Sequence, residues 1–92
     1  MLILKQRKGF KKDAKRAKSR GKDLLKLKEI VDQLIKKEPL DHKLNDHSLS
    51  GNSTGFRECH IEPDWLLIYY VDYKKNVLIL ARTGSHGDLF NK

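Results

Sequence analysis

Hydrophobic positions recur at helical spacing through the first third of the chain and predict two helices. The first helix is expected over 8–20, and Gly21 predicts its end because glycine readily adopts a left-handed cap conformation. Its narrow apolar stripe, set among lysines, consists of Phe10, Ala14 and Ala17. Asp23 is a suitable N-cap for the second helix, and Pro39 should end that helix near residue 37. The apolar face of the second helix consists of Leu24, Leu27, Ile30, Val31, Leu34 and Ile35.

The remaining apolar runs predict strands. A short strand is expected at 2–5, before the helices, and a polar loop at 38–55 after them. Three further strands are expected at about 55–61, 65–72 and 76–83. Because the joints between these three are short, we expect antiparallel pairing. The 92 residues thus predict a single domain, 1–92, of the α+β class, in which two N-terminal helices pack on a small antiparallel sheet in the order β-α-α-β-β-β.

Charge is distributed unevenly along the chain. The formal net charge is +8; residues 1–37 hold fourteen Lys/Arg and four Asp/Glu, whereas residues 38–92 hold six and eight. A basic N-terminal part favours a polyanionic partner, and nucleic acid fits best. An anionic membrane surface competes with it, but the basic segment lacks the aromatic and leucine-rich face of an interfacial helix. Simple solvation of a charged helix is the third interpretation.

The cysteine content and the N-terminus bear on the compartment. Cys59 is the one cysteine, so no internal disulfide can form, which is typical of a reducing cytoplasm; we expect it to be a small buried hydrophobic residue. The apolar start, 2–4, is too short for a signal peptide, and no stretch approaches a membrane span. The sequence therefore predicts a soluble, cytoplasmic protein.

Two predicted hairpins gather polar side chains at one end of the sheet. A two-residue turn at Glu62-Pro63 would put His60 opposite Trp65, and the next hairpin would bring Arg82 beside Trp65. The gathered set is expected to be His60, Asp64, Trp65, Arg82 and His86.

This set fits RNA cleavage by internal transfer. Imidazole suits both the base and the acid because its ordinary pKa, about 6.5, lies near working pH. The guanidinium of Arg82 suits the phosphate, Asp64 could orient or charge an imidazole or act as the base, and Trp65 offers a face for an unstacked base. Structural roles remain open for each: a strand-end histidine, a turn aspartate, a core tryptophan, and an Arg82–Glu58 ion pair. A zinc site from His60, Asp64 and His86 is conceivable, but close His/Cys ligand spacing is missing.

Four stretches resemble the RelE-type toxins of bacterial toxin–antitoxin pairs and, within them, the YafQ branch. They are Asp46–Gly51, Phe56–Tyr69, Arg82–His86 and Leu89–Phe90. The combination of His-x3-Asp-Trp with Arg-Thr-Gly-x-His is the specific part. The sequence departs from the branch at 52–54 (Asn-Ser-Thr), where a bulkier or basic pair is expected, which puts substrate contacts there in doubt.

The resemblance implies an endoribonuclease that cuts messenger RNA, typically in the ribosomal decoding site, and that a small cognate antitoxin neutralises. It implies no cofactor and no metal. The residues it implies for catalysis are His47, His60, Asp64, Arg82 and His86, and those for substrate binding are Trp65 and Phe90. As hypotheses, His86 is the general acid, His60 with Asp64 forms the base, Arg82 steadies the phosphate, and His47 helps to orient the substrate.

Two other functions remain open. A related branch of the same fold is thought to poison DNA gyrase, which would not need the histidines; alternatively, the chain could bind RNA without cutting it. The predicted strands also have apolar residues on both faces, although two helices can cover only one face. The other face is expected either to receive a partner chain such as an antitoxin or to lie under the loop 38–55.

Overall fold

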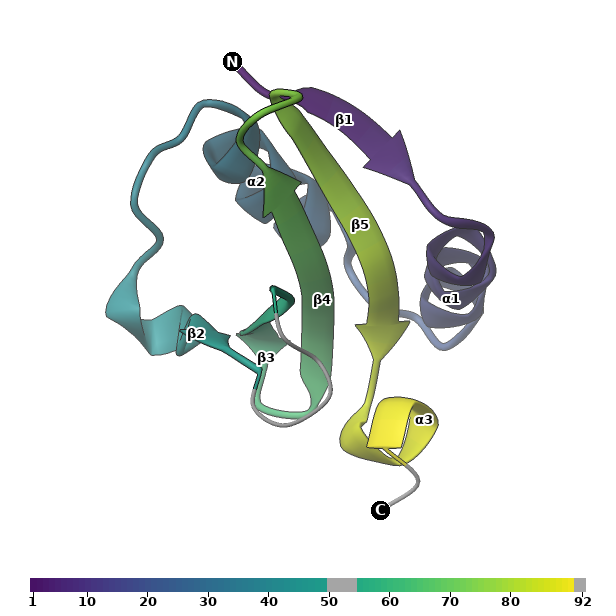
Figure 1. Ribbon diagram of the computed structural model, residues 1–92. Coiled ribbons are helices and arrows are strands. Elements are labelled where there is room, and N and C mark those ends of the chain that lie inside the picture. The colour runs from purple at the N-terminus through teal and green to yellow at the C-terminus, as the bar shows by residue number, and fades with distance from the viewer. Residues whose placement is uncertain (50–54, 91–92) are drawn as a thin grey trace.

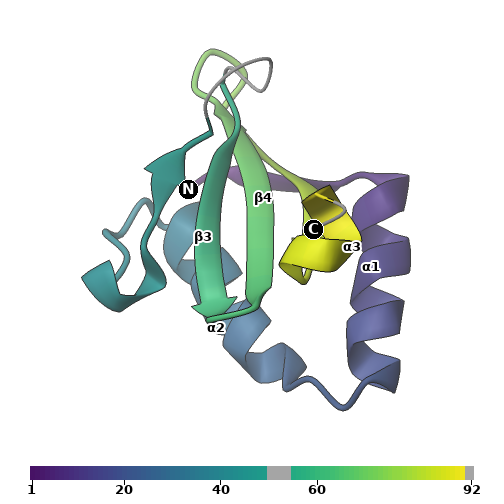
Figure 2. The same cartoon turned by 90° about the horizontal axis from the view of Figure 1, so that it is seen from below.

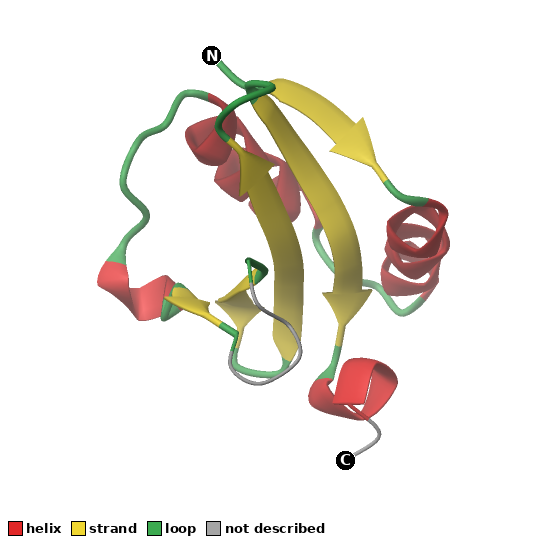
Figure 3. Cartoon of the chain, in the orientation of Figure 1, coloured by secondary structure: helices red, strands yellow, loops and turns green. Residues whose placement is uncertain are grey.

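The computed structural model describes residues 1–49 and 55–90, and its elements confirm the predicted α+β class (Figures 1 and 3). In chain order they are β1 (Ile3–Gln6), α1 (Lys8–Ser19), α2 (Leu24–Ile35), the 3-10 turn η1 (His42–Leu44), β2 (His47–Ser48), β3 (Arg57–Glu62), β4 (Trp65–Asp72), β5 (Val77–Gly84) and α3 (His86–Phe90). The two-residue strand β2 and the single-turn helix α3 were not among the predicted elements. Residues 52–54, where the sequence departs from the YafQ branch, lie outside the described residues.

The five strands form one mixed sheet with the order β1-β5-β4-β3-β2. β3, β4 and β5 pair antiparallel as expected, and β2 adds a further antiparallel pair with β3. β1, however, pairs in parallel with β5, from Ile3 opposite Val77 to Gln6 opposite Leu80. The prediction of a wholly antiparallel sheet is therefore wrong at one edge. Both helices and the hairpins intervene between β1 and β5, so a long crossover makes the parallel pairing possible.

The helices begin and end close to where the sequence predicts. Asp23 caps α2 by accepting a hydrogen bond from the backbone N–H of Leu25 at 3.0 Å. Gly21 has φ +81°, a conformation that favours glycine, and so ends the turn after α1. The last helical residue of α2 is Ile35 rather than residue 37, because Lys37 itself turns into the left-handed region at φ 60°.

The hydrophobic core lies between the helices and one face of the sheet. Figure 1 shows α2 behind β4 and β5, and Figure 2 shows α1 at one side of the sheet and the η1–β2 segment at the other. The core consists of Leu2, Phe10, Ala17, Leu27, Ile30, Val31, Cys59, Ile61, Trp65, Leu67, Tyr69, Leu78 and Leu80. We call the opposite sheet face, which no helix crosses in front of β4 and β5 in Figure 1, the open face.

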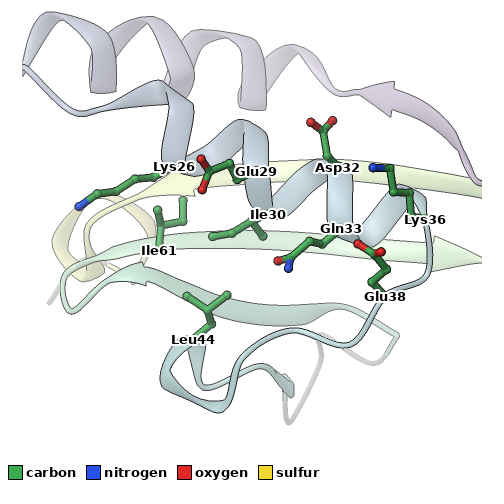
Figure 4. A pocket seen from close by; sticks show the side chains of 9 residues that line it. All are labelled: Lys26, Glu29, Ile30, Asp32, Gln33, Lys36, Glu38, Leu44 and Ile61. Carbon is green, nitrogen blue, oxygen red and sulfur yellow. The ribbon is translucent and has the colours of Figure 1, made fainter.

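The loop after α2 packs on the helix side of the sheet. Leu40 and Leu44 contact the core cluster, so the described part of the loop does not fold over the open face. A groove of about 510 Å³ lies between α2, η1 and β3 (Figure 4). Its floor is apolar, from Ile30, Leu44 and Ile61, and charged side chains of α2 form its rim. It contains none of the predicted site residues.

Two further predictions concern burial. Cys59 is free and buried, as expected, and burial raises the pKa of its thiol to about 12. None of the helices in the described ranges has the length and hydrophobicity needed to cross a bilayer.

Candidate active site

Two β-bulges set the register of the sheet and correct the predicted strand partners. Glu62 pairs with Trp65, and the register shifts so that His60 lies opposite Leu66 rather than opposite Trp65. A second shift between Ile68 and Tyr69 puts Arg82 opposite Ile68, so Arg82 is not the neighbour of Trp65. A bulge adds one residue to one strand, and hairpin length alone does not reveal it.

These registers align functional side chains in two rows on the open face. Cys59 and Ile61 belong to the core, and alternation along β3 therefore directs Glu58 and His60 to the open face. Glu58 lies opposite Ile68 of β4, and Ile68 lies opposite Arg82 of β5. The next row runs from His60 through Leu66 to Gly84. Leu66 and Ile68 are buried and form an apolar floor beneath the polar groups.

Three histidines come together above this floor. The ring centroids of His60 and His86 are 5.8 Å apart, and those of His47 and His60 are 6.3 Å apart. Their side chains are 45%, 21% and 44% exposed for His47, His60 and His86, so a polymeric substrate can reach all three. The predicted convergence of His60 and His86 is therefore confirmed.

Asp64 holds His86, not His60. One carboxylate oxygen, Oδ1, accepts from the backbone N–H of His86 at 2.8 Å and lies 2.7 Å from its ring Nδ1. These two contacts with His86 lower the pKa of Asp64, which therefore remains ionised. Because Nδ1 faces a carboxylate it carries the hydrogen, and Nε2 of His86 is left for another group. The predicted base pair of His60 with Asp64 is wrong: the turn carries Asp64 to the start of α3.

Glu58, for which the sequence predicts no catalytic role, is the acidic partner of His60. Its side chain is buried, and Oε1 lies 3.4 Å from Nε2 of His60 and 3.7 Å from Nε2 of His47. Ligand atoms of Glu58, His60 and His86 all lie within 4.8 Å of one another. The signal was present in the sequence, because residues two apart in a strand share a face.

The position of His47 depends on the residue before it. His47 pairs with Glu58 across β2 and β3, and its Nδ1 lies 2.7 Å from the carbonyl oxygen of Asn45. On the helix side, Asp46 accepts from Arg57 at 2.9 and 3.3 Å and from the hydroxyl of Tyr69. We call Asp46, Arg57 and Tyr69 the Asp46 network. It fixes the short strand from which His47 reaches the open face.

Arg82 is held from the side of α1. Its Nε donates to Oδ2 of Asp13 at 2.5 Å and its Nη2 to Oδ1 at 3.2 Å, and Asp13 raises the pKa of the guanidinium. The Arg82 side chain is 43% exposed. Its acidic partner is Asp13 rather than Glu58, which lies across Ile68.

The two aromatic predictions have different outcomes. Trp65 is 1% exposed and belongs to the core, so the prediction that its ring stacks on an RNA base is wrong for this structure. Alternation explains the error, because Trp65 points to the helix side while its neighbour Leu66 points to the open face. Phe90 is 38% exposed and, four residues after His86, lies on the same side of α3.

α3 is fixed at its base by Asp88. The carboxylate accepts from Arg20, the C-cap residue of α1, at 2.7 Å and from the backbone N–H of Ser85 at 2.9 Å, and these contacts lower its pKa well below the usual range. Gly84 allows the Asp88 side chain to pack this close to the end of β5, since a Cβ at position 84 would lie 3.0 Å from Cβ of Asp88. Asp64 and Asp88 therefore restrain the helix that carries His86.

Comparison with known proteins points in one direction. Residues 2–91 match the family model described as bacterial toxin of type II toxin-antitoxin system, YafQ. The mRNA interferase toxin YafQ of Escherichia coli K12 is 44% identical over 82 residues, which cover 88% of this chain and 87% of that protein. A copper-bound mutant toxin from Helicobacter pylori has 47% identity and a TM-score of 0.92, covering 98% of this chain and 100% of the other. The E. coli DinJ-YafQ complex matches with 38% identity and a TM-score of 0.88, covering 98% and 99%.

Proposed function

The chain belongs to the YafQ family of bacterial type II toxins, and from this premise we propose that it is an endoribonuclease that cuts messenger RNA by acid–base catalysis. The observation that carries the proposal is the pair of imidazoles, His60 and His86, 5.8 Å apart and each beside its own carboxylate. An acid and a base must each lie about 3 Å from the oxygen they serve. One phosphodiester group between the rings meets that requirement.

His86 is the general acid. In this role its protonated Nε2 gives a proton to the departing 5′-oxygen as the bond from phosphorus to that oxygen breaks. The ionised Asp64 holds the ring at Nδ1 and pairs with the charge of the protonated ring. Because Asp64 also accepts from the backbone N–H of His86, the ring and the start of α3 are held together.

Glu58 and His60 form the base. The pair takes the proton from the 2′-hydroxyl, whose oxygen then attacks the phosphorus to form a 2′,3′-cyclic phosphate. Glu58 is buried, and its Oε1 lies 3.4 Å from Nε2 of His60 and 3.7 Å from Nε2 of His47, so the carboxylate holds both imidazoles in place. His47 is the second imidazole and orients the nucleotide through Nε2, since its Nδ1 is engaged with the carbonyl of Asn45.

Arg82 steadies the negative charge that builds up on the phosphate. Its Nε and Nη2 are bound to Asp13, so Nη1 is the nitrogen that remains for a phosphate oxygen. Phe90, half-exposed beside His86, offers an aromatic surface to the base next to the cleaved bond. A groove of about 320 Å³ lined by Lys43, Asn45, His60 and Pro63 gives the flanking RNA a path.

A product analysis tests the chemistry. Purified protein is incubated with free RNA in EDTA and, separately, with programmed ribosomes at constant Mg²⁺ with a chelator of transition metals. We expect a 5′ fragment that ends in a 2′,3′-cyclic phosphate and a 3′ fragment with a free 5′-hydroxyl. A 5′-phosphate product that requires added metal would refute metal-independent transfer, and intact RNA recovered in a salt-sensitive complex would favour binding without cleavage.

The partners follow from the same premise. The E. coli YafQ relative occurs in a complex with DinJ, and we propose that a cognate antitoxin neutralises this chain in the cytoplasm. Ribosome-bound mRNA is the proposed substrate, because the exposed lysines of α1 suit a large RNA surface. Cleavage with and without ribosomes tests that point. Inhibition of gyrase by the purified chain, with RNA left uncut, would favour the gyrase-poisoning alternative.

Glu58, His60 and His86 can also hold a transition-metal ion. Imidazole and carboxylate are the ligands that zinc and copper accept, and the H. pylori relative is copper-bound. We propose that such an ion inhibits the chain, because it occupies the lone pairs that proton transfer needs. Added Cu²⁺ should stop cleavage and a chelator should restore it; stimulation by Cu²⁺ would contradict this proposal.

A further inference from the structure

Asp13 of α1 is a buried carboxylate that makes no contact with the histidines. It is 4% exposed, yet it accepts four hydrogen bonds. Two come from Arg82, at 2.5 and 3.2 Å, one from the backbone N–H of Thr83 at 3.1 Å, and one from Nη2 of Arg16 at 2.9 Å. A buried charge is costly unless it is paired and hydrogen-bonded, and these partners satisfy it.

We propose that Asp13 is a positioning residue that fixes the guanidinium of Arg82 for the phosphate; the inference rests on the proposed nuclease function. The carboxylate engages Nε and Nη2 in a fork, a geometry that sets both the distance and the plane of the guanidinium. Nη1 is the nitrogen left for the substrate. Without this contact Arg82 has the rotamer freedom of a 43% exposed side chain.

Asp13 also ties this fork to the sheet. β1 pairs with β5 only as far as Gln6 opposite Leu80, so among the described residues the outer edge of β5 has no strand partner beyond that point. Oδ2 of Asp13 accepts from the backbone N–H of Thr83, and the same oxygen binds Nε of Arg82. Oδ2 of Asp13 therefore fixes the position of the Arg82 side chain relative to the backbone of Thr83.

The local charge balance preserves the positive charge that the phosphate needs. Asp13 alone would cancel Arg82, but Arg16 also binds Asp13 at 2.9 Å. Arg16 approaches Asp88 at 3.8 Å, and Arg20 binds Asp88 at 2.7 Å. The cluster thus contains three guanidinium groups and two carboxylates, and it retains a net charge of +1 beside the open face.

Gly9, one helical turn before Asp13, supports the same interpretation. A Cβ at Gly9 would lie 3.2 Å from Cδ of Arg82 and 3.7 Å from its Nε. Residues four apart on a helix share a face, so Gly9 and Asp13 form one track along which the Arg82 side chain lies. Gly9 leaves room for the aliphatic part of the Arg82 side chain, and Asp13 fixes its guanidinium group.

A double-mutant cycle separates positioning from a purely structural role. The variants are Asp13→Asn, which keeps the shape and removes the charge, Arg82→Ala, and the two combined. Single-turnover cleavage of a labelled model mRNA on programmed ribosomes is measured at saturating protein. Arg82→Ala should slow cleavage about 100-fold, the usual effect of losing one donor to a transition-state oxyanion. Asp13→Asn should slow it about tenfold alone but less than about twofold when Arg82 is already absent, since the two act as one unit.

A spectroscopic readout keeps the inference independent of activity. In ¹H–¹⁵N spectra the Nε–H signal of Arg82 should be sharp and slow to exchange in the wild type, and should lose this protection in Asp13→Asn. If the wild type cuts no RNA, the proposed function fails, yet this signal still decides whether Asp13 fixes Arg82. Asp32→Asn, which breaks an exposed ion pair with Lys28 on α2, is the matched control and should change neither measurement.

Two results would overturn the proposal. One is an equal rate loss from Asp13→Asn with and without Arg82, which would mean that the carboxylate acts through the fold in general. The other comes from Arg82→Lys, which also serves as the fallback variant if Asp13→Asn does not fold. Because the Arg82 side chain is 43% exposed, this change should leave the fold intact. Lysine keeps the charge but cannot form the fork, so cleavage by Arg82→Lys within about twofold of wild type would show that positioning is unnecessary.

Discussion

Removing one buried hydroxyl should weaken both the fold and the position of His47. Tyr69 is 2% exposed, and its hydroxyl donates to Asp46, the residue immediately before His47. Tyr69→Phe deletes that donor without changing the ring that packs in the core. The Asp46 network then holds the strand β2 through Arg57 alone.

The size of the effect follows from what remains around Asp46. A hydrogen bond to a charged group contributes about 1.5–3 kcal/mol. Asp46 keeps two N–H donors of Arg57, and a groove of about 330 Å³ lined by Asp46, Arg57, Tyr69 and Tyr73 lets water reach the vacated position. The loss should therefore fall at the lower end, about 1.5 kcal/mol, which corresponds to roughly 6–12 °C in Tm for a domain of this size.

The same variant has a pH signature. Burial, followed by the hydrogen bond to Asp46, raises the pKa of Tyr69 above the value for free tyrosine, about 10. The neutral phenol therefore stabilises the fold fully below pH 10, and this contribution is lost as the pH rises toward the higher folded-state pKa. The difference in unfolding free energy between wild type and Tyr69→Phe should shrink above pH 10.

Urea unfolding and single-turnover cleavage provide the assays. Cleavage by Tyr69→Phe should be slower than by wild type. The loss should be smaller than that from removing a proton-transfer group, about 100-fold, because His60 and His86 keep their carboxylate partners. Tyr73→Phe is the matched control, since Tyr73 is 77% exposed and should change neither quantity. If Tyr69→Phe unfolds at the same urea concentration as wild type, the Asp46 network neither stabilises the fold nor fixes the position of His47.

Three other changes test separate parts of the site. His86→Ala should lower the cleavage rate about 10²–10⁴-fold, as for loss of a general acid, while circular dichroism and Tm remain near wild type. Gly9→Ala should raise stability by up to about 1 kcal/mol through helix propensity and yet slow cleavage, because the new Cβ would crowd Arg82 at 3.2 Å; unchanged cleavage would show that the arginine has room. The contact with Arg20 lowers the pKa of Asp88, so the ionised carboxylate stabilises the fold above pH about 4, and this stabilisation is lost as the pH falls further. In Asp88→Asn the unfolding free energy should therefore depend less on pH in the acid range. Thermal melts from pH 6 to pH 2 measure this dependence, and parallel curves for both proteins would contradict the assignment.

Local patterns predicted the elements of this fold well. The apolar faces of α1 and α2 recur every three or four residues, and their members Phe10, Ala17 and Ile30 are in the core as expected. The hairpins of β3, β4 and β5 also follow from short polar turns between apolar runs. The parallel pairing of β1 could not be predicted in this way, because a strand of four residues with exposed side chains carries no signal for its partner.

The site was harder to predict because its partners depend on single-residue shifts. A bulge between His60 and Glu62 changes which residues face each other, and Asp64, in the turn that follows, contacts His86 instead of His60. Trp65 illustrates the same sensitivity: one position along the strand separates a buried ring from the open face. Glu58 shares the face of His60 by strand alternation alone, so it could have been identified by applying that rule to the acidic residues as well as to the histidines.

Helix α1 carries both a buried carboxylate that binds Arg82 and a row of exposed lysines. Asp13, Asp64 and Asp88 lie within 2.5–3.3 Å of cationic or N–H groups that they orient, so each carboxylate has hydrogen-bond partners close by. The lysines of α1 at 8, 11, 12, 15 and 18 are exposed, and their field extends outward to about a Debye length. One side of α1 therefore binds Arg82 through Asp13, while the other presents the positive charge that we propose attracts RNA. Salt should weaken capture of RNA more than it slows the chemical step, because ions screen exposed charges far more than the contacts that surround buried Asp13.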